Sequence, residues 1–133
     1  MKTTSAHLGS ALLVLLIVSA CGGEEAQVST GENVSSKASI PEESRKLYKA
    51  FCSLCHGQTG TGDGASAVAL EPKPRNYQDK EWQTSVSDAQ LTKTILYGGQ
   101  AVGLSASMPP RQDLIDKPEV VAGLVQIIRN FGE

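Results

Sequence analysis

Three stretches of the chain carry apolar residues at intervals of three and four positions, the spacing that gathers them on one face of an α-helix. The first runs from Pro41 to Cys55, the second from Ser87 to Tyr97, and the third from Asp116 to about Asn130. Their apolar positions are Leu47, Tyr48, Phe51 and Leu54; Leu91, Ile95 and Leu96; and Val120, Val121, Leu124, Val125, Ile127, Ile128 and Phe131. The pattern predicts three helices, and the last is expected to pack across the first.

Polar residues mark the ends of these helices. Ser87 followed by Gln90 is typical of a capping box, and Gly98 is a typical helix terminator. Asp116 followed by Glu119 predicts a similar cap before the last helix.

Residues 1–20 have the pattern of a secretory signal. Lys2 lies in a short polar stretch, and the apolar run 11–18 after it is shorter than the roughly 20 residues of a membrane span. The segment ends in Val18-Ser19-Ala20-Cys21, which resembles the lipobox of bacterial lipoproteins. The resemblance implies cleavage before Cys21 and lipidation of its thiol. The alternative is a signal that is cleaved elsewhere, beside an unrelated Cys.

Residues 21–39 are rich in Gly, Ser and Glu and have no apolar period, so they are expected to form a flexible tether. Residues 40–133 then suffice for one small domain. Lipidation places this domain on the periplasmic side of a bacterial membrane. Gly22 after the Cys, rather than Asp, permits sorting to the outer membrane by analogy with lipoproteins, and the inner membrane stays open as well.

The run Cys52-Ser53-Leu54-Cys55-His56 is the pattern that attaches c-type haem. Each thiol can add to one haem vinyl group, and the imidazole that follows can bind the iron. A structural zinc site would need two more Cys or His ligands, and the chain after the signal offers only His56. A thioredoxin-like dithiol would open a helix in a βαβ pattern, whereas this run follows a helical segment. With Cys21 lipidated, none of the three Cys is left for a disulfide.

The second axial ligand of the iron is expected from the loop between residues 100 and 110. Met108 is the only Met besides the initiator, and it lies between a small-residue loop and Pro109-Pro110. A Met thioether is a common axial ligand, although a lone Met is more often a filler of core gaps. Prolines restrict the backbone beside Met108, as a pre-formed ligand loop requires.

The segment 70–77 contains two prolines and is expected to run extended. An iron-binding His usually donates its other ring nitrogen to a carbonyl. We expect Pro74 to present this carbonyl, with Pro72 as the second choice, and Arg75 to pair with a haem propionate. The Gly-rich run 57–64 lacks the Lys-Ser/Thr of a phosphate loop, so it predicts a tight turn away from the haem.

Together these residues resemble class I c-type cytochromes, over the whole of residues 40–133. The resemblance implies an all-α cytochrome c fold, with three main helices around one covalently bound haem c. It assigns Cys52 and Cys55 to the thioether bonds, and His56 and Met108 to the two axial positions on the iron.

The same resemblance implies that the first and last helices cross at right angles. Many members have Gly at this crossing, where this chain has Ser44, and an aromatic residue on the last helix, where it has Ile127. Ser44 is small enough to keep the crossing. Tyr48 stands where the family has an aromatic residue on the first helix.

These features predict a membrane-tethered carrier of single electrons. Its expected donor is a quinol-oxidising complex, and its acceptor a terminal oxidase or a soluble carrier; it is otherwise a subunit of one such complex. A ligand sensor or peroxidase with a labile Met108 is the alternative, but the chain after the signal has no second His for acid–base work. A purely structural haem subunit is a third reading. The formal charge of −2 makes a nucleic-acid partner unexpected.

Overall fold

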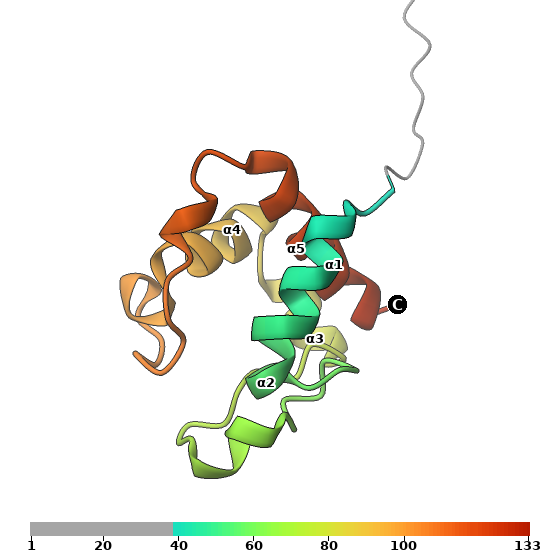
Figure 1. Ribbon diagram of the computed structural model, residues 1–133. Helices are drawn as coiled ribbons and strands as arrows, with labels where there is room; N and C mark the ends of the chain where they lie inside the picture. The colour runs from blue at the N-terminus through green and yellow to red at the C-terminus, as the bar shows by residue number, and fades with distance from the viewer. Residues whose placement is uncertain (1–38) are drawn as a thin grey trace, which may run out of the picture. The chain divides into compact units, whose positions relative to one another are not determined.

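The structure is a computed structural model that describes residues 39–133. The expected signal (1–20), Cys21 and the tether as far as residue 38 lie outside the described residues. The part described is helical and has no strand, which confirms the all-α prediction (Figure 1). Its helices are α1 (Glu42–Leu47), α2 (Ser53–His56), α3 (Lys80–Ser85), α4 (Asp88–Tyr97) and α5 (Pro118–Phe131), with a π-helical segment at Tyr48–Cys52 and 3-10 turns at Ala65–Ala69, Gly99–Val102 and Gln112–Leu114. None of the helices within residues 39–133 has the length and apolar character needed to cross a membrane.

The first predicted helix is present but is not a plain α-helix, because α1 and α2 are joined by the π-helical segment. The Ser53 N–H bonds to the carbonyl of Tyr48, five residues back, and so bypasses Lys49. The Ser53 hydroxyl donates to the bypassed Lys49 carbonyl at 2.8 Å. One side chain thus satisfies the acceptor that the wider turn leaves without its usual N–H.

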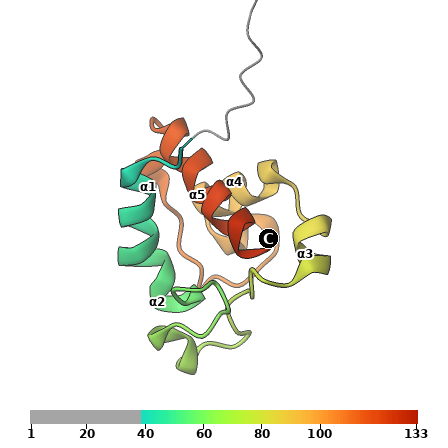
Figure 2. The ribbon, with the colours of Figure 1, turned by 90° about the vertical axis from the view of Figure 1, so that its right-hand side faces the viewer.

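Helices α1 and α5 cross in contact, as Figure 1 and Figure 2 show from two sides. Ser44 is fully buried at the crossing, and its hydroxyl donates to the Val120 carbonyl at 2.8 Å. The residue without a side chain is Gly123 on α5, where an added Cβ would lie 2.3 Å from the Ser44 oxygen. The small residue expected on α1 is therefore matched by a Gly on the opposite helix, and Ser44 adds a hydrogen bond to the close approach.

An aromatic residue on the last helix does meet the first helix, but it is not at position 127. The Phe131 ring lies 5.3 Å from the Tyr48 ring, centroid to centroid, at an angle of 47°. Ile127 is only partly buried beside the core. The aromatic pair implied by the resemblance is thus formed one helical turn later than expected.

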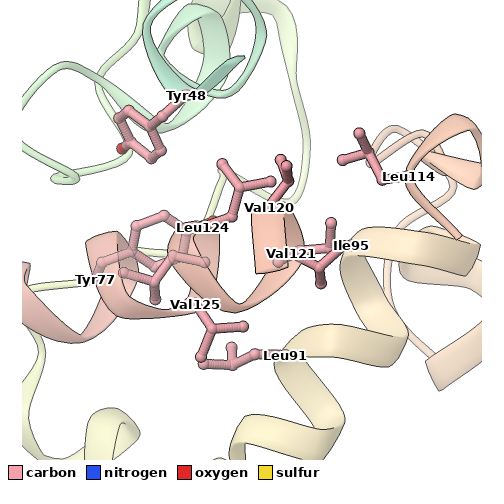
Figure 3. Close-up of a cluster of buried hydrophobic side chains, with 10 residues drawn as sticks. Tyr48, Tyr77, Leu91, Ile95, Leu114, Val120, Val121, Leu124 and Val125 are labelled. Carbon is pink, nitrogen blue, oxygen red and sulfur yellow. The ribbon is translucent and has the colours of Figure 1, made fainter. Parts of the chain in front are cut away.

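The core lies along α5, which contacts α1, α4 and the turn Gln112–Leu114. Figure 3 shows Val120, Val121, Leu124 and Val125 of α5 between Tyr48 and the α4 side chains Leu91 and Ile95. Burial of one such aliphatic side chain contributes about 1.5–3 kcal/mol.

The capping predictions have different outcomes at the two later helices. The Ser87 hydroxyl accepts from the N–H of Gln90 at 3.2 Å, and α4 ends at Gly98 with φ of 80°, as expected. The Asp116 cap is wrong, because α5 begins after Lys117 without a side-chain cap. Pro118 opens that helix instead, where a missing N–H costs nothing.

Candidate haem-attachment site

Cys52 ends the π-helical segment, while Cys55 and His56 lie in α2. Both thiols are half-buried, and neither forms a disulfide. Burial raises the pKa of the Cys52 thiol, and the nearby positive charge of Arg111 opposes this pKa shift. Within residues 39–133 no three His, Cys, Asp or Glu side chains converge on a common point, so the zinc alternative gains no support.

His56 is buried, with 8% of its surface exposed. Its Nδ1 lies 3.2 Å from the backbone oxygen of Arg75. A carbonyl oxygen can only accept, so Nδ1 carries the proton and the lone pair of Nε2 is left for a metal. Burial lowers the pKa of His56, and the hydrogen bond to Arg75 partly opposes the shift. The buried ring is therefore held neutral, which is the state that binds iron.

The carbonyl that orients His56 belongs to Arg75, so the prediction of Pro74, with Pro72 second, is wrong. The Pro74 carbonyl packs against Gly62, where an added Cβ would lie 2.5 Å from it. Adjacent carbonyls of one extended segment differ in direction, and residue types do not encode which one faces the ring. The acceptor of the His56 hydrogen bond therefore lies one residue further along the chain than predicted, and it is still a backbone carbonyl.

Tyr77 stacks on the imidazole of His56, with 4.5 Å between ring centroids and 15° between the planes. Trp82 stacks on Tyr77 in turn, with 5.5 Å between the ring centroids. The Arg75 guanidinium lies 5.6 Å from the Trp82 ring and 3.8 Å from a carboxylate oxygen of Asp79. The expected pairing of Arg75 with a propionate stays a prediction; its side chain is half exposed.

The glycine-rich run forms the expected tight turn, but it folds back onto the end of α2. The N–H groups of Gly62 and Gly64 donate to the carbonyls of His56 and Cys55 at 2.8 and 3.1 Å. These carbonyls belong to the last turn of the helix and have no partner within it. The turn therefore caps the attachment run.

Tyr48 forms a further hydrogen bond to the end of the attachment run. Its hydroxyl is buried and donates to the carbonyl of Gly57 at 2.9 Å, directly after His56. Burial is the main cause that raises the pKa of Tyr48 far above its usual range, so it remains a hydrogen-bond donor. The sequence identifies Tyr48 as an aromatic of the first helix and gives no signal of this bond.

Met108 lies half-buried in a loop held mainly by backbone hydrogen bonds. Its carbonyl accepts from the Gly99 N–H at 3.0 Å, and its own N–H donates to Ser105 at 3.2 Å. The Arg111 N–H donates to the Ile95 carbonyl at 2.9 Å, which anchors the end of the loop on α4. In Figure 1 this loop, in orange, runs alongside α4.

Arg111, like Tyr77, is a residue of the site that the sequence analysis does not identify. Its guanidinium lies 4.6 Å from the centre of the Phe51 ring, directly before Cys52. The Nε and Nη2 atoms of Arg111 donate to the two carboxylate oxygens of Asp113 at 2.9 and 2.7 Å. The only signal in the sequence is its position, three residues after Met108 and directly after two prolines.

The residues at this site fit haem c. Cys52 and Cys55 are three residues apart, near one helical turn, with His56 next to the second thiol. Large apolar side chains stay exposed on the segments that carry the attachment run and Met108: Phe51 by 56%, Leu54 by 49% and Leu104 by 59%. Apolar surface of this kind is what a porphyrin would cover.

A helical domain built around a Cys-x-x-Cys-His run with a fixed imidazole defines the class of haem-attaching c-type domains. The family model described as cytochrome c oxidase, cbb3-type, subunit III matches residues 40–126. The chain belongs to this family and is a class I monohaem c-type cytochrome, an electron-transfer protein whose cofactor is covalently bound haem c. A comparison with curated proteins finds no match.

Proposed function

We propose that this cytochrome carries single electrons while tethered to a membrane, with Met108 as the second axial ligand of its iron. Haem c, when bound, supplies an iron that changes oxidation state by one electron. The chain's own residues hold that iron, keep the imidazole neutral and surround the porphyrin with apolar groups. They supply no second His for proton transfer after the signal.

The observation that carries this proposal is the fixed imidazole of His56. Its Nδ1–H is committed to Arg75 and its ring is stacked on Tyr77, so Nε2 is the only ring nitrogen left to bind iron. An imidazole held in one tautomer and one orientation needs little rearrangement when the oxidation state changes. This favours fast electron transfer over ligand exchange on the proximal side.

Met108 is supported as the distal ligand by its chemistry and by the loop that carries it. Gly99 and Ser105 fix its backbone, and Pro109 and Pro110 restrict the residues that follow. A thioether raises the reduction potential relative to a harder ligand. A filled distal position would leave the iron closed to small ligands.

The anchoring part of the proposal rests on the sequence. The lipobox-like run ending in Cys21, followed by a polar segment as far as residue 39, suits a lipidated Cys and a tether on the periplasmic side of a membrane. Several acyl chains at one residue hold a protein firmly, whereas a single chain holds it only marginally.

Redox proteins are the expected partners, with a quinol-oxidising complex as donor. The matching family is named after a subunit of a cytochrome c oxidase. This name supports a terminal oxidase, either as the acceptor of the electrons or as the complex to which the chain belongs. A soluble carrier remains the other acceptor.

The test of the ligand is a set of visible spectra of the haem-loaded protein, oxidised and reduced, with and without carbon monoxide. The wild type should show a thioether–iron charge-transfer band and ignore carbon monoxide, whereas Met108→Ala should lose the band and bind the gas. Gln100→Ala is the matched control, because it removes an exposed side chain from the same loop. Ready binding by the wild type would overturn the carrier and favour the sensor or peroxidase.

The anchor is tested by fractionating cells that express the wild type and Cys21→Ser. The wild type should enter the membrane fraction and take up labelled fatty acid, and the variant should do neither. Equal distribution of the two proteins would contradict the lipid anchor without affecting the ligand assignment.

A further inference from the structure

Arg111 joins the two segments that carry the ligands. It follows Met108 by three residues, and its guanidinium lies over the ring of Phe51, the residue before Cys52, at 4.6 Å. A cation at this distance from an aromatic face is attracted to it. This contact therefore spans from the Met108 loop to the attachment helix.

The guanidinium is held where the contact requires it. Asp113 accepts from two of its nitrogens, at 2.9 and 2.7 Å, and the Arg111 side chain is only 22% exposed. Its backbone N–H is bonded to Ile95 of α4 at 2.9 Å. A paired and partly buried guanidinium loses less freedom on making the contact than a solvated one.

Movement of Arg111 is coupled to Met108 through two prolines. Pro109 and Pro110 fix their own φ angles, and Pro109 restricts Met108 to extended backbone as well. The Met108 carbonyl is bonded to Gly99 on the other side of the loop. The loop is thus attached through its backbone to Gly99 and to Ile95, and the Arg111 side chain attaches it to the attachment helix.

We propose that the Arg111–Phe51 contact is a latch that positions the Met108 loop against the attachment helix and so keeps the thioether on the iron. This rests on Met108 being the axial ligand. Arg111 is a positioning residue, because it acts through the loop and through Phe51. Breaking the contact should increase the fraction of time in which the distal position is open.

The test compares Arg111→Gln, Phe51→Leu and the double variant in the haem-loaded protein. The rate of carbon monoxide binding to the reduced form should rise about fivefold in each single variant, which corresponds to about 1 kcal/mol. The double variant should show no further rise, because both changes remove the same contact. The reduction potential should fall in parallel, as the thioether is lost for part of the time.

A further variant separates the latch from the loss of a positive charge. Lys49→Gln removes an exposed cation from the same helix and should change neither quantity. Haem content and thermal unfolding identify a variant that does not fold, in which case the other single variant is used.

The outcomes distinguish the latch from the ligand assignment. A wild type that binds carbon monoxide readily overturns Met108 ligation and the latch with it. A wild type that excludes the gas, with single variants that also exclude it, overturns the latch alone. Additive effects of the two single changes would show that Arg111 acts independently of Phe51, and this too would overturn the latch.

Discussion

The proximal and distal sides of the site are built in different ways. On the proximal side His56 is buried, hydrogen-bonded to Arg75 and stacked on Tyr77, and the glycine turn bonds to the carbonyls beside it. On the distal side Met108 is half-buried in a loop, with backbone bonds and one cation–π contact nearby. His56 is fixed by its own side-chain contacts, whereas the position of Met108, the proposed second ligand, depends on its loop.

This difference indicates on which side of the site an iron ligand can be exchanged. Regions with few buried contacts open at lower free energy than the core. With Met108 as the proposed second ligand, the imidazole of His56 would have to break buried contacts to leave the iron, whereas the thioether would need only a loop movement. Ligand exchange in this protein should therefore begin on the distal side.

The largest expected difference between the two sides comes from two glycines with similar backbone angles. Gly62→Ala places a side chain at φ of 80° and 2.5 Å from the Pro74 carbonyl, whereas Gly103→Ala, at φ of 76°, meets nothing within 4 Å. Left-handed backbone costs about 1–2 kcal/mol in both, and the overlap adds about 1–3 kcal/mol at Gly62 alone. Urea unfolding of the haem-loaded proteins measures the loss of unfolding free energy in each variant. Equal losses in the two variants would mean that the proximal turn accommodates a side chain as readily as the distal loop does.

Removal of one buried hydroxyl on the proximal side should have a smaller effect. Tyr48→Phe leaves the buried carbonyl of Gly57 without its donor and should destabilise the protein by about 1–3 kcal/mol. The control is Tyr97→Phe, whose side chain is 46% exposed and which should change little. Thermal unfolding of the haem-loaded proteins compares the two. Carbon monoxide binding should stay slow in Tyr48→Phe, because the Tyr48 hydroxyl bonds to Gly57 beside His56 on the proximal side.

The smallest effect is expected at Asp113, on the distal side, and it should depend on pH. The hydrogen bond from Arg111 lowers the pKa of Asp113, so the ionised pair persists above the ordinary Asp pKa of about 3.9 and is lost as the pH falls through the lowered value. Asp113→Asn should slightly speed carbon monoxide binding at neutral pH, and its difference from wild type should vanish in acid. Asp79→Asn, the equivalent change at the Arg75 pair, is the proximal control. A difference that persists in acid would contradict this role for the carboxylate.

Local signals in the sequence predict the parts of this structure that depend on local chemistry. The attachment run, the Ser87 cap and the apolar faces of α4 and α5 all follow from spacing and residue type. The cytochrome fold follows from these features together with the family resemblance. Each is encoded within a stretch of a few residues.

The parts that were missed depend on contacts between distant segments. The carbonyl facing His56 is set by the course of the chain 19 residues later, and the partner of Tyr48 on α5 by where two helices cross. The contact of Arg111 with Phe51 joins residues that no periodicity relates. Residue types allow all three contacts, and only the folded chain selects them.

The π-helical segment has a consequence for the phase of the first helix. An α-helix advances about 100° per residue, so one extra residue in a turn rotates everything after it by about that angle. Ser44, which meets α5, and Cys55, in the attachment run, therefore belong to two helical frames offset by one residue on either side of Tyr48–Cys52. A helical wheel drawn through all of residues 42–56 assigns one of these faces wrongly. Deleting Ala50, an exposed residue of the segment, would merge the two frames into an ordinary α-helix while leaving the crossing and the attachment run in phase with their present surroundings.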